Sequence, residues 1–374
     1  MRKLKKRKLR SILYMGCYRM DIHRNFMTVL GLKKNNVNVL EYNVQSHKIL
    51  ENIIFFIKDF SNKLKYQNYD IILFHSEAHI QFYLAKLLSF IKGVPLVHDI
   101  FISKLQTIYF DRQQFKKRKI PKFLLYLILY FIDIIECKFA DYLTLDAYSH
   151  IKYFHETFNI PIKKFRKVLV GSNDNLFYPM EKIKHENEKF IVGFTGTYIP
   201  LQGIEFIIKA AKILESDEEI VFHLIGEGQM YNQIKELVKQ LNVKNTVLMG
   251  KKPINEIPKL ISNFDINLGI FGNTKKATQV IATKIFDGIA MKKPTITAET
   301  PAIRELFTNN KNIILCERAN PESLANAILN LKHNETLRNK IADNGYELFK
   351  KHCNIYTVGK SWKITLTNIL NKKK

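Results

Sequence analysis

Apolar runs of five to eight residues alternate with longer segments of helical spacing along almost the whole chain. This alternation is typical of repeated β–α units, in which the apolar runs form a buried parallel sheet between layers of helices. Each run is therefore predicted to be a strand. In the first half the predicted strands are SILYMG (11–16), VNVLEY (37–42), DIILFH (70–75), VPLVHD (94–99), DYLTLD (141–146) and RKVLVG (166–171).

The pattern stops at the polar, charge-mixed stretch YPMEKIKHENEK (178–189) and then starts again. We therefore predict two doubly wound parallel-sheet domains, 1–178 and 179–350, followed by a helix within 351–374 that packs back toward the first domain. Helical spacing is also present at 335–349. The strands predicted in the second domain are FIVGFTG (190–196), EIVFHLIG (219–226), NTVLMG (245–250), DINLGIF (265–271), PTITA (294–298) and NIILC (312–316).

Length and composition agree with two globular domains, because 374 residues with 46% apolar content can fill two cores. The four cysteines lie far apart, which suggests neither a disulfide framework nor a zinc site and fits a reducing compartment. RKLKKRKLR at the N-terminus, followed by SILYMGCY, resembles part of a signal peptide. The apolar run is short, however, has no small-residue cleavage site and continues into Arg19 and Asp21. We expect a cytoplasmic protein.

The formal net charge is +25, and the basic excess is larger in the first half of the chain than in the second. A positive field attracts nucleic acid, anionic lipid headgroups or phosphorylated substrates. Aromatic residues are not interleaved with the basic runs at 2–10 and 116–119, and no nucleic-acid recognition motif is present. A nucleic-acid-binding module is therefore the least favoured function, and we expect no nucleic-acid partner.

Glycines follow two predicted strands of the second domain, at the edge where open α/β sheets bind their ligands. Gly196 and Gly203 lie between the first strand and the next helix, and Gly226 and Gly228 follow the second strand. They let the backbone approach a ligand, and the helix that starts near Gly203 presents free N–H groups to an anion. Glycines that serve only a tight β–α turn explain the same pattern.

The stretch VIATKIFDGIAMKKPTIT follows the fourth strand of the second domain and opens a predicted helix of ten residues. Thr283 is a good residue to cap this helix, and Lys284 places a cation in its first turn, where a phosphate is favoured. Asp287 lies on the same side, and its carboxylate can accept hydrogen bonds from two ribose hydroxyls. A solvated Lys–Asp pair is the alternative interpretation.

Segments in both halves carry a resemblance to a known family. The second half contains FTGTYIPLQGIEFIIKAAKIL, HLIGEGQMYNQI, DINLGIFG, TKIFDGIAMKKPTIT and AETPAIREL. The first half contains RSILYMGCYRMDIHRNFMTVLGLKKNNVNVLEYN, GVPLVHDIFIS, FADYLTLDAYSHIKYF and KVLVGSNDNLFYP. In this order and spacing the segments resemble family 4 glycosyltransferases (glycosyl transferases group 1) of the GT-B fold. The resemblance implies two Rossmann-like domains that face each other across a cleft.

The same resemblance implies an activity, which is transfer of a sugar from a nucleotide diphosphate donor to an acceptor, with retention at the anomeric carbon. It implies no metal ion and no cofactor, and the sequence has no Asp-x-Asp triplet, in agreement. The acceptor class would be a glycan or a lipid-linked glycan at the inner membrane face. Alternatives within the fold are a nucleotide-sugar epimerase and a degenerate member that binds without catalysis.

Several family positions are altered in this sequence. The two acidic residues that bracket the donor in the family correspond here to Gln279 and Asp287, of which Gln279 is not an acid. The family's phosphate-binding Arg and Lys correspond to Thr197 and Gln202, so both cations are absent. Burying a diphosphate without a compensating charge costs several kcal/mol. We therefore expect Lys284 to replace the missing cations, with Lys275 or Lys276 as the alternatives.

In the first domain the resemblance points to residues that follow strands. Gly16 would lie under the donor phosphates. His98 would lie close to the transferred sugar, with Asp99 beside it, and both are catalytic candidates together with Gln279 of the second domain. A neutral imidazole can bind a hydroxyl or relay a proton, although a structural histidine is as frequent at such a place. HSEAH (75–79) has two histidines four residues apart, but Ser76 stands where zinc peptidases carry glutamate, so no metal site is predicted.

The segment FKKRKIPKFLLYLILYFIDIIECKF (115–139) has an uncharged apolar run of only ten residues, too short for the roughly 20 that span a bilayer. It is apolar on every face and can form a core helix. The preceding KKRK also suits a helix that lies on an anionic membrane surface, with help from the basic N-terminus. Core packing and peripheral membrane contact both remain open.

Overall fold

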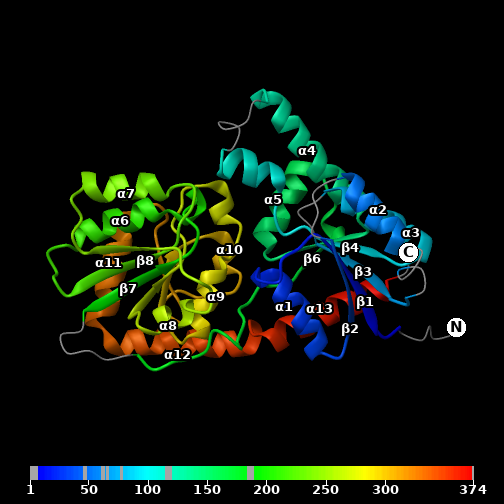
Figure 1. Ribbon diagram of the computed structural model, residues 1–374. Coiled ribbons are helices and arrows are strands. Elements are labelled where there is room, and N and C mark those ends of the chain that lie inside the picture. The colour runs from blue at the N-terminus through cyan, green and yellow to red at the C-terminus, as the bar shows by residue number, and fades with distance from the viewer. Residues whose placement is uncertain are drawn as a thin grey trace. The chain divides into compact units, whose positions relative to one another are not determined.

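The computed structural model describes residues 7–44, 49–59, 64, 67–75, 79–113, 120–182 and 189–372, and it contains two compact units. Unit 1 holds residues 1–109, 115–170 and 355–374, and unit 2 holds residues 110–114 and 171–354. The division at 170–171 falls before the polar stretch 178–189, where we placed it from sequence. Residues 355–374 belong to unit 1, so the last helix returns to the domain in which the chain starts (Figure 1).

Unit 1 is built on a six-stranded sheet in which every neighbouring pair is parallel. Helices cover both faces of its central strands, which are buried at every residue except Tyr142, and this explains why these strands are rich in apolar residues without a regular alternation. In spatial order the strands are β2 (Asn38–Asn43), β1 (Ser11–Gly16), β3 (Ile71–Phe74), β4 (Leu96–Asp99), β5 (Tyr142–Leu145) and β6 (Phe165–Lys167).

Alternate residues of β1 point to opposite faces of this sheet. Ile12 and Tyr14 pack with helices α1 (His23–Lys34) and α13 (Ile355–Leu370). Leu13 and Met15 belong to a second core. The helices that contribute to this second core are α2 (Ile49–Asp59), α3 (His79–Lys92), α4 (Lys122–Phe139) and α5 (Tyr148–Phe158), and a π-helical segment, Leu105–Asp111, lies between α3 and α4 in sequence.

Helix α13 is fixed to unit 1 by a direct backbone contact with α1. A Cβ atom on Gly359 would lie 2.0 Å from the carbonyl oxygen of Gly31, so only glycine allows this approach. The side chain of Trp362 is fully buried next to the crossing, and Asn35 donates a 2.9 Å hydrogen bond to the carbonyl of Tyr356. The return of the chain to unit 1 is therefore a tightly packed feature of the fold.

Unit 2 is built on a second six-stranded parallel sheet, of order β12-β11-β10-β7-β8-β9. Counted from the start of the unit this is the order 3-2-1-4-5-6 of dinucleotide-binding folds, and it reverses between β7 and β10. The strands are β7 (Phe190–Thr195), β8 (Ile220–Ile225), β9 (Thr246–Gly250), β10 (Ile266–Leu268), β11 (Thr295–Ala298) and β12 (Ile314–Cys316).

Helices also cover both faces of this sheet. The larger core contains side chains of α6 (Ile204–Ile213), α7 (Tyr231–Gln240) and α11 (Pro321–His333). On the other face α9 (Thr283–Ala290) packs between the sheet and α12 (Glu335–His352), and a Cβ on Gly288 would lie 2.1 Å from the side chain of Asn267 in β10. Two short helices complete the unit, α8 (Ile257–Ser262) and α10 (Pro301–Arg304).

All twelve predicted strands occur in the structure, and the largest difference is at β6. We predicted a strand at 166–171, whereas the sheet pairing covers Phe165–Lys167. The apolar character continues to Val168 and Val170 because both side chains are buried, not because they extend the strand. An apolar run in the sequence therefore indicates buried residues. Here the buried residues continue past the end of the strand, up to the start of unit 2.

Candidate functional site

The loops after β7 and β10 pack back to back at the point where the strand order of unit 2 reverses. Gly203 has φ +67°, and a Cβ atom on it would lie 2.4 Å from the backbone nitrogen of Gly272. The Phe271 N–H donates a 2.9 Å hydrogen bond to the carbonyl of Gln202. This close backbone contact fixes the start of helix α6 against the β10 loop, which is where open α/β sheets place their ligands.

The loops after β7 and β8 are joined in the same way. A Cβ atom on Gly226, at φ +137°, would lie 1.9 Å from the carbonyl oxygen of Gly196. One on Gly228, at φ +157°, would lie 2.7 Å from the carbonyl of Tyr198. The glycines therefore serve loop packing, which was the alternative to a ligand role in the sequence. Between these contacts Thr197 is exposed.

Lys284 in the first turn of α9 is almost completely buried, at 4% exposure. Its ammonium group donates to the side-chain oxygen of Gln202 and lies 4.0 Å from the centroid of the Phe194 ring. Burial lowers the pKa of Lys284 well below its ordinary value, and Asp287 only partly opposes this shift. A Cβ atom on Gly196 would lie 2.4 Å from the Lys284 amino nitrogen, so the lysine runs directly beneath the β7 loop.

The rest of α9 differs in part from the prediction. The helix has eight residues, and its N-cap is Ala282, without a side-chain hydrogen bond, so the prediction that Thr283 caps the helix is wrong. Asp287 is buried and accepts a 2.5 Å hydrogen bond from the hydroxyl of Ser172. Gln279 is also buried, at the end of a 3-10 turn that contains Lys275 and Lys276.

In unit 1, Asp99 forms a buried two-pronged ion pair with Arg24. The Arg24 Nε and Nη2 atoms lie 2.8 and 2.7 Å from the two carboxylate oxygens, and the Thr144 hydroxyl donates a further hydrogen bond of 2.7 Å. Burial alone would raise the pKa of Asp99, but the Arg24 guanidinium outweighs it and holds the pKa below its ordinary value. With its oxygens occupied, Asp99 has a structural role in place of the catalytic one that we expected.

His98 lies at the end of β4 between two aromatic rings, with centroids 5.1 Å from Phe74 and 5.2 Å from Phe82. Burial lowers the pKa of His98 to about 4, so the imidazole is neutral at pH 7. Within the described residues its Nδ1 atom has no hydrogen-bond partner. Gly16, at the end of β1, has φ +152° and is also buried.

Some polar groups near these strand ends were not identified from sequence. His150 Nδ1 lies 2.9 Å from Asp146, and both residues are buried. Their i, i+4 spacing was the only available signal. His75 Nδ1 lies 3.0 Å from the Asp99 carbonyl oxygen, and the side chain of His79 lies outside the described part of the structure. Within that described part, no cluster of three or more His, Cys, Asp or Glu side chains is placed to hold a metal ion.

Residues 179–348 match the family model described as glycosyl transferases group 1. This region is thus similar to the group 1 glycosyltransferases. The matched region includes the β7 and β10 loops, Gln202, Lys284 and Asp287, so all the unit 2 candidates except Ser172 lie within it.

Curated relatives resemble the same part of the chain. An uncharacterized glycosyltransferase of Methanocaldococcus jannaschii is 29% identical over 158 residues, which cover 42% of each chain. The poly(ribitol-phosphate) alpha-N-acetylglucosaminyltransferase of Staphylococcus aureus is 24% identical over 157 residues, 41% of this chain and 30% of that protein. The matched region thus spans less than half the length of these relatives.

Solved structures resemble nearly the whole chain. HepE of Anabaena, in complex with UDP-glucose, has a TM-score of 0.70 at 14% identity, covering 96% of this chain and 99% of that one. Sucrose-phosphate synthase of Thermosynechococcus elongatus has a TM-score of 0.72 at 12% identity with the same coverage. At such identities the likeness concerns the fold, and the fold is that of GT-B glycosyltransferases, as we predicted.

Proposed function

We propose that this protein is a glycosyltransferase that moves a sugar from a nucleoside diphosphate donor to a hydroxyl of an acceptor, with retention at the anomeric carbon and without a metal ion. The similarity to group 1 glycosyltransferases supports the reaction class. A uridine nucleotide is the first donor to test, since HepE is described with UDP-glucose and a further neighbour, TarM, with UDP and alpha-GlcNAc-glycerol.

The observation that carries this proposal is the position of the Lys284 ammonium group. The family's phosphate-binding lysine corresponds here to Gln202, and Lys284 reaches the Gln202 side chain from another helix. This contact supports the proposal that Lys284 supplies the charge of the missing family lysine. The immediate surroundings of Lys284 are one amide oxygen and one ring, so a lysine with three N–H donors would gain from a nearby phosphate.

In the proposed reaction the bond between the anomeric carbon and the diphosphate oxygen breaks, and the acceptor oxygen forms the new bond on the same face. The diphosphate leaves with the bonding electrons and takes up the proton of the acceptor hydroxyl. Lys284 and the N–H groups at the start of α9 would stabilise the departing charge. Asp287 would accept hydrogen bonds from the ribose.

The test of the donor site is a thermal-shift screen with UDP, GDP and ADP on wild type and Lys284→Met. A ligand at a hundredfold its dissociation constant adds about 2.7 kcal/mol to the free energy of unfolding. Methionine fills the buried space without a charge, so we expect an unliganded melting temperature at least as high as that of wild type, and no nucleotide shift. The control is Lys235→Met, in the same unit. A full shift in Lys284→Met would remove Lys284 from the site.

Two alternatives make different products from a labelled donor. An epimerase would convert the sugar without any acceptor, whereas a glycosyltransferase would leave its configuration unchanged and transfer it only when an acceptor is present. A degenerate member would bind nucleotide and do neither. Incubation of labelled UDP-glucose with and without a bacterial lipid extract, followed by separation of sugars and lipids, distinguishes the three.

We further propose that unit 1 contacts an anionic membrane surface at the inner face of the membrane, from which a lipid-linked acceptor would be reached. Among the described helices none is long and apolar enough to cross a bilayer. Helix α3 packs against both α2 and α4, and all three carry large apolar side chains that are exposed. This apolar helix face comprises Leu50, Ile54, Phe55, Ile57, Tyr83, Leu87, Phe90, Ile91, Phe123, Leu124, Ile128, Phe131 and Phe139.

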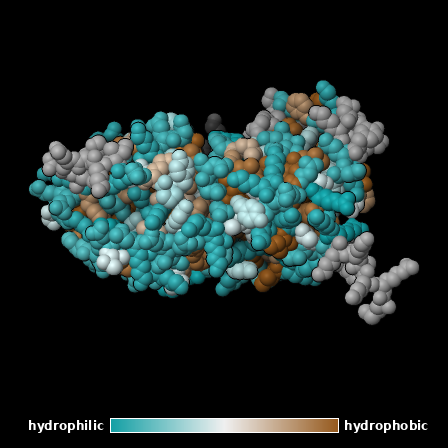
Figure 2. All heavy atoms as spheres, turned by 90° about the horizontal axis from the view of Figure 1, so that it is seen from below, coloured by the Kyte–Doolittle hydropathy of each residue, from teal (hydrophilic) through white to brown (hydrophobic). Residues whose placement is uncertain are grey.

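Figure 2 shows one face of the molecule, on which hydrophilic residues predominate and hydrophobic residues form separate patches. Helix α4 packs into the core through Leu125 and Leu129, which are buried, and the exposed Phe123 and Phe131 are the side chains that would contact the membrane in this proposal. The test is co-sedimentation with vesicles of phosphatidylcholine and phosphatidylglycerol. Each phenylalanine side chain removed from water contributes about 1.5–3 kcal/mol, so Phe90→Ser with Phe123→Ser should lower binding more than tenfold. Ile254→Ser, exposed in unit 2, should bind as wild type.

A further inference from the structure

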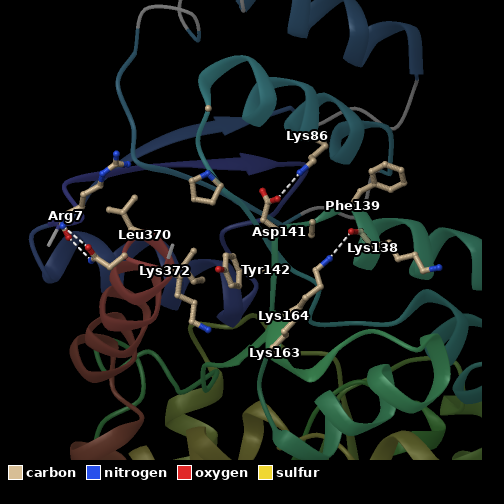
Figure 3. A pocket seen from close by; sticks show the side chains of 15 residues that line it. Arg7, Lys86, Lys138, Phe139, Asp141, Tyr142, Lys163, Lys164, Leu370 and Lys372 are labelled. Carbon is tan, nitrogen blue, oxygen red and sulfur yellow. Dashed lines mark hydrogen bonds and ion pairs between the residues drawn. The ribbon is translucent and has the colours of Figure 1, made fainter. Parts of the chain in front are cut away.

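Unit 1 contains a cavity of about 1200 Å³ that is separate from the strand ends discussed above (Figure 3). It is lined by Pro95 just before β4, by Asp141 just before β5 and by Lys164 just before β6. In a parallel sheet the starts of neighbouring strands share one edge. The cavity therefore lies at the edge opposite to His98, and strands of four residues span about 13 Å between the two edges.

The charge of the lining is strongly positive. Asp141 is the one acidic residue of the lining, and its carboxylate already accepts hydrogen bonds from the Leu96 N–H at 2.8 Å and the Lys86 ammonium at 3.1 Å. For Lys138, Lys163 and Lys372, no ion pair is found among the described residues. The basic residues of the lining are Arg7, Lys86, Lys138, Lys163, Lys164 and Lys372.

Two of the basic residues are anchored by hydrogen bonds, Lys164 through its ammonium group and Arg7 through its backbone. Lys164 donates to the carbonyls of Cys137 at 2.9 Å and Lys138 at 2.8 Å, at the end of helix α4, which leaves one of its three N–H donors for another partner. Burial lowers the pKa of Lys164, and the nearby charge of Lys86 lowers it further. Arg7 is tied to the end of α13 through hydrogen bonds of 2.8 and 2.9 Å between its backbone and Asn371.

We propose that this cavity binds a phosphate group that is attached to a larger molecule. Several ammonium groups around one opening suit a multiply charged anion, and lysine binds phosphate as a point charge. The volume exceeds that of most ligand pockets, so there is room for the group to which the phosphate is attached. The phosphate belongs either to a phospholipid headgroup or to a soluble phosphate ester.

Two exposed apolar side chains lie near the cavity. They are relevant to whether the bound phosphate belongs to a phospholipid or to a soluble ester. Phe139, which is 57% exposed, belongs to the lining and follows Lys138 (Figure 3). Phe90, at 83% exposure, is four residues from Lys86 on α3 and therefore on the same side of that helix. An acyl chain beside a bound headgroup would find apolar contacts at both positions.

The test uses the full-length protein with two lining lysines reversed, Lys138→Glu with Lys163→Glu. Both side chains are exposed, so folding should be preserved. The matched control reverses Lys152 and Lys360, which are exposed in unit 1 and do not line the cavity. Binding of inorganic phosphate is measured by calorimetry with saturating UDP present, which keeps phosphate from the site proposed in unit 2. Binding to vesicles of phosphatidylcholine with and without phosphatidic acid is measured in parallel.

We expect the lining variant to lose phosphate affinity by about tenfold to a hundredfold, as for loss of charge-assisted hydrogen bonds, while the control and the UDP thermal shift stay unchanged. If vesicle binding that depends on phosphatidic acid falls with it, the ligand is a lipid headgroup. If vesicle binding is unaffected, the ligand is a soluble phosphate ester. The proposal is overturned if wild type does not bind phosphate, if the lining variant binds as wild type, or if the control loses as much. Lys138→Gln with Lys163→Gln replaces the reversal if the glutamates prevent folding.

Discussion

Among the described residues, each unit has a buried cation near the carboxyl ends of its strands, and the two cations, Arg24 and Lys284, differ in their surroundings. Arg24 in unit 1 meets both oxygens of Asp99, donates to the carbonyls of Val168 and Leu169, and lies 5.0 Å from the Trp362 ring. Lys284 in unit 2 has the amide oxygen of Gln202 and the ring of Phe194. The first cation has a carboxylate as its partner, whereas the contacts of the second are with a neutral amide and a ring, which is why we propose an anionic ligand for it.

The pKa shifts express the same difference. Burial opposes the charge of Arg24, but Asp99 outweighs it and the pKa of Arg24 is raised. For Lys284, burial outweighs the attraction of Asp287 and the pKa falls. A buried charge with a complete set of partners is part of the structure, and one without them is a candidate for binding. Arg24 should thus matter for folding, and Lys284 for ligand affinity.

The largest effect is expected from Asp99→Asn, which leaves Arg24 buried without its counter-charge. Breaking a buried ion pair by removal of one partner costs about 3–5 kcal/mol. We therefore expect the free energy of unfolding, measured with urea, to fall by this amount. The double variant Arg24→Met with Asp99→Leu should recover much of the loss. A loss under about 1 kcal/mol in the single variant would contradict the structural role.

The second prediction concerns His98, whose burial should make the free energy of unfolding fall at acidic pH, by somewhat less than the loss expected for Asp99→Asn. Its pKa is about 4 in the folded chain and about 6.5 when unfolded, so the unfolded state binds the proton more readily. Stability is therefore complete above pH 6.5 and is lost as the pH falls toward 4, by up to about 3 kcal/mol. In His98→Phe this part of the pH dependence should disappear. In His352→Gln, an exposed control, it should persist, and identical curves for wild type and His98→Phe would be evidence against the assignment.

The pH dependence of nucleotide affinity tests whether Lys284 binds the diphosphate. If diphosphate binds the charged form of Lys284, binding adds a proton, so UDP should bind more tightly as the pH falls from the ordinary lysine value toward neutrality. The limit is about tenfold per pH unit, or about 1.4 kcal/mol. Calorimetry above pH 7.5 in buffers of different ionisation enthalpy measures the proton uptake. Lys284→Met should show none, and equal uptake in both proteins would exclude Lys284 as its source.

The elements of the fold could be predicted from sequence because burial of a strand on both faces leaves a local apolar run. The contacts of the sites could not, because their partners are distant in the chain. Arg24 and Asp99 are 75 residues apart, Lys284 and Gln202 are 82 apart, and Ser172 and Asp287 are 115 apart. Lys284 itself was identified from its helix position, but its burial beneath the β7 loop depends on the packing of Gly196, which no local pattern reports.

The smallest effect is expected at Ser172, which holds Asp287 through one hydrogen bond. A single buried hydrogen bond contributes about 0.5–1.5 kcal/mol, or roughly a two- to tenfold change in affinity. The Ser172 hydroxyl donates to one oxygen of Asp287 and orients the carboxylate, which accepts hydrogen bonds from the ribose in the proposed function. In Ser172→Ala we therefore expect a weaker preference for UDP over its 2′-deoxy analogue, whereas Ser172→Thr, which keeps the hydroxyl, should preserve that preference. If Ser172→Ala lowers stability but leaves the preference intact, Asp287 supports the fold as Asp99 does, and the contrast between the two units rests on Lys284 alone.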